Sequence, residues 1–210
     1  MTTRIIIERH GQSIGNAERI YLGITDLGLT DEGVEQAKIT AEALKDEKID
    51  VIYSSDLKRA YFTAKAHADM RGMEVKTSEK LREMFVGDWE GLDVGYLETN
   101  FYEDFVIKRT HRDFVYPGGE SVVEASERFK AEIFRIAKEN EGKSILVVSH
   151  SAVIRAFWYY LSGYTEQNMT DRVPFMLNAA YCILEYDGER LIPVSYNINS
   201  HLPKSKVKPI

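Results

Sequence analysis

The chain lacks several features that mark specialised classes of protein. Its one cysteine, Cys182, cannot form an internal disulfide, and it lies in an apolar run where a buried, unreactive thiol is expected. No apolar run approaches the length that crosses a membrane, and the apolar stretch near the N-terminus is too short for a signal peptide. With 33 acidic residues against 27 basic ones, the net charge of −6 argues against nucleic acid or a membrane surface as the main partner. The sequence therefore predicts a cytoplasmic protein in which any anion site is a local cluster of positive charge.

The 210 residues have the composition of an ordinary globular domain, with 44% apolar and 29% charged residues. Short β-branched runs alternate with helical patterns along the whole chain. The strand-like runs lie at residues 5–8, 49–53, 75–77 and 144–149, and a hairpin is expected from 179–186 and 191–197. This alternation predicts a single α/β domain over residues 1–210, a three-layer α/β/α sandwich with a mostly parallel central sheet.

Several helix ends carry local signals. Thr30 precedes two acidic residues and is a candidate N-cap, and residues 54–56 (Ser-Ser-Asp) offer caps for a second helix that Gly72 ends. Residues 15–28 are polar and contain glycine, which is typical of a loop. Residues 93–114 are rich in aromatic side chains, and we predict that they are helical.

Positively charged and imidazole side chains follow the strongest strands. Arg9 and His10 come directly after the first strand, Arg59 lies in the first turn of the helix after the second, and His150 follows the strand 144–149. Because the carboxyl ends of parallel strands meet at one edge of a sheet, these side chains can converge. Guanidinium groups suit phosphate oxygens, and a neutral histidine can attack phosphorus. The pattern predicts a phosphate pocket that contains a nitrogen nucleophile.

A leaving alcohol also needs a proton, and Glu83 is the best-placed acid for this role. It lies in residues 81–91, Leu-Arg-Glu-Met-Phe-Val-Gly-Asp-Trp-Glu-Gly. The same stretch and its surroundings contain other acids, Asp88, Glu90 and Asp93, and spacing alone does not separate them from Glu83.

Four fragments together resemble the histidine phosphatase superfamily, which has the phosphoglycerate mutase-like fold. They are Arg-His-Gly at 9–11, Ser-Asp-Leu-Lys-Arg-Ala at 55–60, the block at 81–91 and Val-Ser-His at 148–150. They occur in the order of the family and span most of the chain. The resemblance assigns a catalytic or binding role to individual residues, which the residue types alone do not.

By this resemblance, His10 is the nucleophile that forms a phosphohistidine, and Glu83 protonates the leaving oxygen and then activates water. Four side chains would hold the phosphoryl oxygens: Arg9, Asn16, Arg59 and His150. The family uses no metal, and we expect no metal and no cofactor here. Each residue also has a structural alternative, since the arginines could form ordinary ion pairs, and Asn16 or His150 could merely cap a loop or helix. His67 and His111 are expected to be solvated or structural, and His201 is at most an indirect contributor.

Family mutases carry extra basic residues after the tryptophan block, whereas residues 91–100 here are acidic and aromatic. Lys108, Arg109 and Arg112 are the nearby substitutes, and the turn at residues 117–121 resembles the phosphatase branch. We therefore predict a metal-independent phosphomonoesterase acting on a small phosphorylated metabolite, with residues 93–116 as a substrate lid. The aromatic residues of this segment either select a ring or pack the lid itself. The alternatives are a cofactor-dependent phosphoglycerate mutase and a binding module without turnover; the oligomeric state, a homodimer included, stays open.

Overall fold

The computed structural model describes residues 2–165, 167, 169 and 172–203, except for the side chains of residues 109 and 110. It contains a central six-stranded sheet with the strand order β3-β2-β4-β1-β5-β6. The first four strands in this order run parallel, while β5 pairs antiparallel with both β1 and β6. The strands are β1 (Thr3–Arg9), β2 (Val51–Ser54), β3 (Val75–Thr77), β4 (Ser144–Ser149), β5 (Tyr181–Tyr186) and β6 (Leu191–Ile198).

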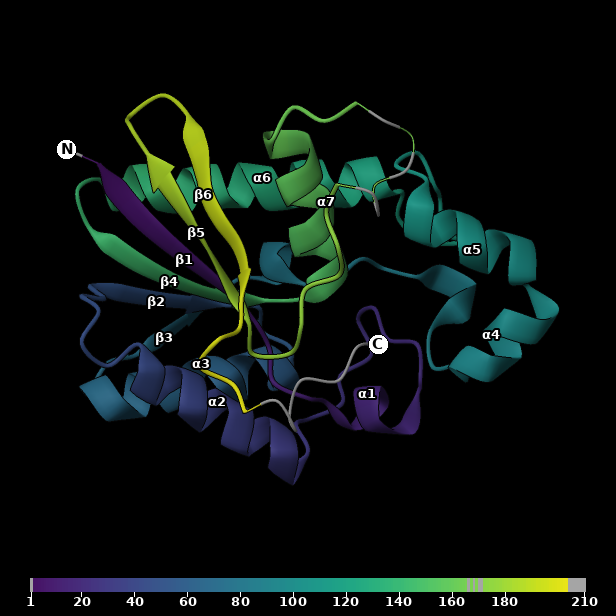
Figure 1. Ribbon diagram of the computed structural model, residues 1–210, viewed down its shortest axis with the longest axis horizontal. Coiled ribbons are helices and arrows are strands. Elements are labelled where there is room, and N and C mark those ends of the chain that lie inside the picture. The colour runs from purple at the N-terminus through teal and green to yellow at the C-terminus, as the bar shows by residue number, and fades with distance from the viewer. Residues whose placement is uncertain (1, 166, 168, 170–171, 204–210) are drawn as a thin grey trace.

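Helices cover both faces of this sheet, so the predicted three-layer α/β/α sandwich is confirmed (Figure 1). In the view of Figure 1, α2 and α3 lie below the sheet and α6 and α7 lie above it. The α-helices are α1 (Ile14–Glu18), α2 (Asp31–Ala43), α3 (Lys58–Arg71), α4 (Val94–Asn100), α5 (Tyr102–Thr110), α6 (Val122–Glu139) and α7 (Ser151–Leu161). Two short 3-10 helices, η1 (Glu79–Leu81) and η2 (Gly87–Trp89), lie between β3 and α4. No α-helix among these described residues is long and apolar enough to span a membrane.

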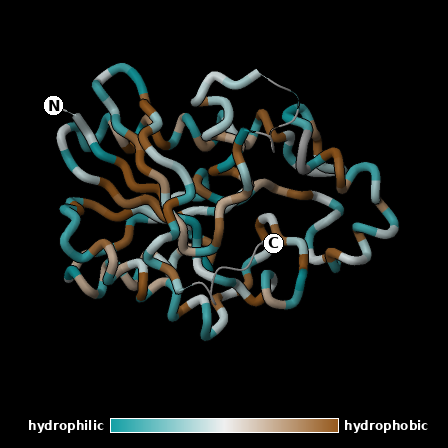
Figure 2. Tube along the Cα trace, in the orientation of Figure 1, coloured by the Kyte–Doolittle hydropathy of each residue, from teal (hydrophilic) through white to brown (hydrophobic). Residues whose placement is uncertain are grey.

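Alternate side chains of the strands supply the two halves of the core. Ile6 of β1 points to the face where the alanines of α3 pack, with Ala60, Ala64 and Ala68 all buried. Its neighbours Ile5 and Ile7 point to the opposite face, under α6 and α7. A central strand covered on both faces is apolar at successive positions, which explains the continuous β-branched run in the sequence (Figure 2).

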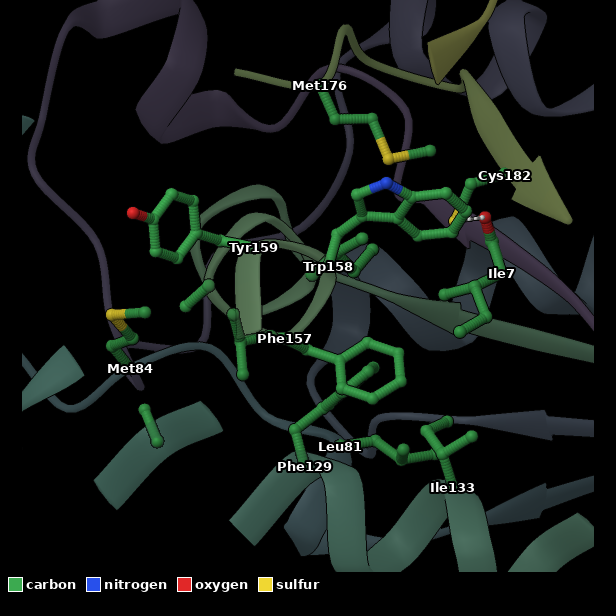
Figure 3. Packing of buried hydrophobic residues seen from close by; sticks show 14 of the residues in the cluster. Ile7, Leu81, Met84, Phe129, Ile133, Phe157, Trp158, Tyr159, Met176 and Cys182 are labelled. Carbon is green, nitrogen blue, oxygen red and sulfur yellow. Dashed lines mark hydrogen bonds between the residues drawn. The ribbon is translucent and has the colours of Figure 1, made fainter. Parts of the chain in front are cut away.

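The larger side of the core includes aromatic residues of α6 and α7. The rings of Phe129 and Phe157 meet edge to face at 5.3 Å between centroids, and Ile133 packs beside them (Figure 3). Cys182 is fully buried in the same cluster, as predicted, and burial raises the pKa of its thiol. These helices fix the position of the N-terminus of α7 at the sheet edge.

Two of the predicted helix caps are confirmed and one is wrong. The Thr30 hydroxyl accepts a hydrogen bond from Gly33 N at 3.0 Å, and Gly72 ends α3 with a φ of 63°. The residues 54–56 do not cap α3, which begins at Lys58 after Leu57 and has no side-chain cap. Ser55 and Asp56 have other partners, because Ser55 contacts His150 and Asp56 forms an ion pair with Arg82.

Two segments differ from the predicted secondary structure. The region read as a loop contains the short helix α1, which Ser13 and Asn16 stabilise through a capping box. Residues 93–114 form two helices instead of one, and the chain turns between α4 and α5 at Phe101, whose backbone (φ −131°, ψ 39°) is not helical. The two helices stand at one end of the molecule, away from the outer strands β3 and β6 (Figure 1).

His67 lies in the core, so of the two predicted alternatives, solvated or structural, the structural one holds. Its side chain is fully buried on α3, and its Nε2 atom lies 2.7 Å from Oε2 of Glu8, which is fully buried on β1. Neither group makes a well-aligned hydrogen bond to another described residue. This contact therefore joins α3 directly to the strand that leads to Arg9 and His10.

Candidate active site

The carboxyl ends of β1, β2 and β4 meet at one edge of the sheet, as predicted. Arg9 ends β1 and His10 follows it; His150 follows β4. At this edge lies a cavity of about 740 Å³, and five of the six predicted site residues line it: Arg9, His10, Asn16, Arg59 and Glu83. The sixth, His150, is fully buried with its ring 5.2 Å from that of His10. The fold thus brings the predicted residues together.

His10 is held in a form suited to nucleophilic attack. Its Nδ1 atom lies 2.6 Å from the carbonyl oxygen of Gly11, which can only accept, so Nδ1 carries the proton and Nε2 keeps its lone pair. Burial lowers the pKa of His10 well below 6.5, and the positive charges of Arg59 and Arg9 lower it further. The imidazole is therefore neutral at pH 7, with Nε2 available to attack an electrophile.

Arg59 and His150 form one connected group. Arg59 Nε donates to Nδ1 of His150 at 3.2 Å, and because that ring nitrogen accepts, Nε2 of His150 donates to the Ser55 hydroxyl at 2.9 Å. The other two nitrogens of Arg59 donate to the carbonyl oxygens of Thr25 and Gly23 at 2.8 and 2.7 Å. Three of the five guanidinium N–H groups are used in this way, and the remaining donors can serve a ligand. In this arrangement His150 holds Arg59 in place. Both ring nitrogens of His150 are engaged, so its ring would have to rotate before it could contact a phosphate.

Arg9, which precedes His10, and Asn16, which follows it, also line the cavity. Arg9 Nε is buried and makes no hydrogen bond to any described residue, although Nη1 donates to the carbonyl of Met176. Burial lowers the pKa of Arg9 to about 10, which still leaves it charged at pH 7. Oδ1 of Asn16 accepts from Ser13 N and from Asn178 Nδ2, at 3.2 and 3.1 Å, which leaves the Asn16 amide nitrogen as a donor for a ligand. Asn16 therefore both caps α1 and lines the cavity.

Glu83 is fixed at the N-terminus of α7. Its Oε1 atom accepts from the backbone N–H groups of Met84 and Val153, both at 2.9 Å, and its Oε2 accepts from Ala152 N at 3.0 Å. Among the described residues, Oε2 has this one partner, and a carboxyl oxygen has room for a second. Oε2 is therefore the atom that can exchange a proton with a substrate in the cavity.

The loop that carries Glu83 is clamped by Arg128 of α6. Arg128 forms a two-pronged ion pair with Glu120, with distances of 2.8 and 2.9 Å, and it also donates to the carbonyl oxygens of Lys80, Arg82 and Glu83. Glu120 in turn accepts from Phe85 N at 2.9 Å. The backbone on both sides of Glu83 is thus tied to α6.

We expect Arg128→Ala to lower kcat by about 10- to 100-fold, because a displacement of the order of 1 Å in a reacting group has such an effect. Lys130→Ala is the matched control, since Lys130 lies on the same helix and makes a partly exposed pair with Glu127. Initial rates with an aryl phosphate measure both variants. Equal kcat in the wild type and the Arg128 variant would show that the clamp does not position Glu83.

The low pKa values of His10 and His150 predict how the protein responds to acid. We expect kcat/KM to stay constant as the pH falls through 6.5, so that the acidic limb of the pH–rate profile lies below that pH.

The free energy of unfolding, in contrast, should decrease as the pH falls below 6.5, because the unfolded chain then binds protons that the folded chain does not. Well above pH 6.5, where these histidines are neutral in the unfolded chain as well, they make stability independent of pH. A pH–rate profile and urea unfolding at several pH values measure both effects, and an acidic kinetic limb at or above 6.5 would contradict them.

Three side chains of the site were not predicted from the sequence. Asn178 donates to the carbonyl of His10 at 3.1 Å, the Thr63 hydroxyl accepts from Gly11 N at 3.1 Å, and Ser55 contacts His150. Thr63 follows Arg59 by one helical turn, a spacing that could have identified it. Asn178 lies in the irregular segment before β5, where no periodic pattern marks it.

Comparison with known proteins agrees with this geometry. A family model of the histidine phosphatase superfamily (branch 1) matches residues 5–199. Phosphoserine phosphatase 1 of Hydrogenobacter thermophilus is 32% identical over 205 residues, which cover 95% of this chain and 94% of the relative. The 2,3-bisphosphoglycerate-dependent phosphoglycerate mutase of Brucella anthropi is 29% identical over 208 residues, with 95% and 94% covered. A solved mycobacterial glucosyl-3-phosphoglycerate phosphatase, in complex with VO3, matches with a TM-score of 0.86 at 27% identity, covering 93% of this chain and 99% of that one.

These matches extend over nearly the whole chain, and the site residues converge as the resemblance in the sequence implies. The chain belongs to the histidine phosphatase superfamily, branch 1.

Proposed function

We propose that the protein is a metal-independent phosphomonoesterase that hydrolyses small phosphorylated metabolites through a phosphohistidine on His10. One observation carries the proposal. A neutral His10 presents the lone pair of Nε2 in a cavity that two buried arginines, Arg9 and Arg59, also line. Such a pocket can bind a phosphate dianion and attack its phosphorus at pH 7.

In the first half-reaction, Nε2 of His10 attacks phosphorus and the bond from phosphorus to the ester oxygen breaks. Glu83 Oε2–H gives its proton to that oxygen, and the alcohol leaves. In the second half-reaction, Glu83 takes a proton from water as the water oxygen attacks phosphorus, the N–P bond breaks, and inorganic phosphate leaves. Arg9, Arg59 and the Asn16 amide stabilise the negative charge on the phosphoryl oxygens in both steps.

Residues 93–116 are proposed as the lid over the organic part of the substrate. Val94, Glu98, Phe105, Val106 and Lys108 of this segment line the same cavity. Most of its aromatic residues pack on one another or on Trp89 of η2. Phe114 and Tyr116 meet edge to face, and the almost fully buried Trp89 contacts the rings of Phe105 and Phe114. This packing supports the alternative in which the aromatic residues build the lid, rather than the one in which they select a ring.

A phosphoglycerate mutase is the second candidate, because a mutase of the family is 29% identical to this chain. Of the basic residues near the segment, Lys108 lines the cavity, and the Arg112 Nε lies 3.5 Å from its neighbour Asp113. The side chain of Arg109 lies outside the described residues. Within the described part of the 93–116 segment, Lys108 is the basic residue that lines the cavity, and the acidic Glu98 lines it too, which supports hydrolysis over retention of a bisphosphate.

The test is an assay in EDTA with 4-nitrophenyl phosphate, and with 3-phosphoglycerate in the presence and absence of 2,3-bisphosphoglycerate. We expect phosphate release that persists in EDTA. Isomerisation that depends on the bisphosphate, with little release, would make the protein a mutase. Loss of activity in EDTA that added metal restores would contradict metal independence. If no phosphate is released from any of a wide panel of phosphomonoesters, the protein would instead be a binding module without turnover. A cytoplasmic location remains a prediction, and the oligomeric state stays open.

A further inference from the structure

The acidic stretch at residues 81–91 contains a second carboxylate that lies outside the cavity. Glu90 is half-buried, and its side chain accepts four hydrogen bonds from three successive residues. Oε1 accepts from Ile24 N at 2.7 Å, and Oε2 accepts from Gly23 N and Thr25 N, both at 3.2 Å, and from the Thr25 hydroxyl at 2.6 Å. An ionised carboxylate has about four acceptor sites, so these contacts use the capacity of Glu90 in full.

The backbone of residues 23–25 is shaped to receive this carboxylate. A Cβ on Gly23 would lie 2.3 Å from Oε1 of Glu90 and 2.2 Å from the carbonyl oxygen of Met84, so the approach requires glycine. Glu90 itself is held firmly, because Trp89 before it is only 1% exposed in the core. Glu90 is therefore a fixed point to which residues 23–25 are attached.

The same three residues hold the guanidinium of Arg59 through their carbonyl groups. Arg59 Nη2 donates to the carbonyl of Gly23 at 2.7 Å, and Nη1 donates to that of Thr25 at 2.8 Å. The carbonyl of Gly23 and the N–H of Ile24 belong to one peptide group, which thus accepts from Arg59 and donates to Glu90, each at 2.7 Å. Hydrogen bonds joined in this way polarise and strengthen one another. A single peptide group therefore links Glu90 to Arg59.

We propose that Glu90 is a positioning residue, which fixes the guanidinium of Arg59 for phosphate binding by holding residues 23–25. The inference rests on the proposed function, in which Arg59 binds the phosphoryl oxygens. The two carbonyl contacts and the contact to His150 set the plane of the guanidinium, and so the direction of its remaining donors. Without Glu90, three backbone N–H groups lose their acceptor, and Arg59 loses the fixed position of its carbonyl partners.

This assignment separates the acids that spacing alone does not. Glu83 lines the cavity, Glu90 holds residues 23–25, and Oδ1 of Asp93 accepts from Tyr96 N at 2.9 Å and caps α4. Asp88 is exposed on η2, two residues before Glu90. Asp88→Ala is therefore a matched control for the loss of an acid from this stretch.

The experiment is a double-mutant cycle on the binding of inorganic phosphate, measured by calorimetry. Glu90→Ala should weaken binding about tenfold, and Arg59→Ala at least as much, as expected for losing a charge-assisted hydrogen bond. In the Arg59→Ala background, Glu90→Ala should change the affinity less than about twofold, because no guanidinium is left to position. A merely structural role would give the same loss in both backgrounds. Asp88→Ala should bind phosphate like the wild type.

Glu90→Gln provides a second cycle that decides the question even if Glu90→Ala does not fold. Glutamine keeps the size of the side chain but has one acceptor oxygen, so we expect a smaller loss that again disappears in the Arg59→Ala background. Unchanged phosphate affinity in the Glu90 variants, or an equal loss with and without Arg59, would overturn the inference.

Phosphate binding needs no turnover, so this test is separate from that of the proposed function, which is His10-dependent hydrolysis of 4-nitrophenyl phosphate. If hydrolysis holds and the cycle is additive, the inference about Glu90 alone fails. If hydrolysis is absent and the cycle is not additive, the proposed function alone fails. A wild type that binds no phosphate would overturn both.

Discussion

Replacing His10 with alanine is expected to lower kcat/KM for phosphate release by at least about 10⁴-fold, because the variant has no nucleophile at this position. The fold should persist. The native imidazole is buried under two positive charges, and its removal leaves neither arginine without its backbone contact. The melting temperature at pH 7.5 should therefore stay near that of the wild type.

His111→Ala is the control for a general effect of losing a histidine, since His111 lies at the C-terminal end of α5 and does not line the cavity. Steady-state rates with 4-nitrophenyl phosphate measure both variants. A His10 variant that folds and keeps a tenth of the wild-type rate would show that the phosphoryl group is transferred directly to water.

The second large effect concerns stability. We expect His67→Leu to lower the free energy of unfolding by about 3–5 kcal/mol, because it leaves the fully buried Glu8 without its contact. For a chain of this size, that loss corresponds to a drop of about 6–20 °C in the melting temperature. Urea unfolding and calorimetry at pH 7.5 measure it.

The double variant Glu8→Leu/His67→Leu separates the effect of leaving Glu8 without its partner from the effect of changed side-chain packing. Two apolar residues can replace a buried polar pair with little loss, so the double variant should recover most of the stability. Lys65→Ala, on the exposed side of α3 and paired with Asp69, should change the melting temperature far less. A single variant as stable as the wild type, or a double variant no better than the single one, would contradict this account of Glu8 and His67.

Much of the site follows from local sequence because it depends on strand ends. Arg9, His10 and His150 come directly after apolar runs that are buried on both faces, and parallel pairing of β1 with β4 places the two ends side by side. Glu83 is different, since no strand leads to it. Its position depends on backbone donors of α7 that lie about 70 residues away in the chain, and the sequence identified it through the resemblance alone.

The parts that sequence could not give are contacts between polar residues of distant segments. Serine is a common helix-capping residue, yet the hydroxyl of Ser55 is hydrogen-bonded to the ring of His150 instead. Gly11 is a second example. A Cβ there would lie 2.4 Å from the carbonyl oxygen of Gly33, so this glycine allows β1 to approach α2, and its φ is not positive. The burial of His67 depends in the same way on Glu8, a charged residue within an apolar strand, which no helical pattern reveals.

The most direct test of the central claim is to quench wild-type enzyme during turnover of 4-nitrophenyl [³²P]phosphate and to map the bound label by peptide analysis. We predict a label that is labile in acid, stable in alkali and located on His10, and that is absent from His10→Ala. Rapid hydrolysis with no label on His10, or a label on another residue, would contradict the phosphohistidine mechanism.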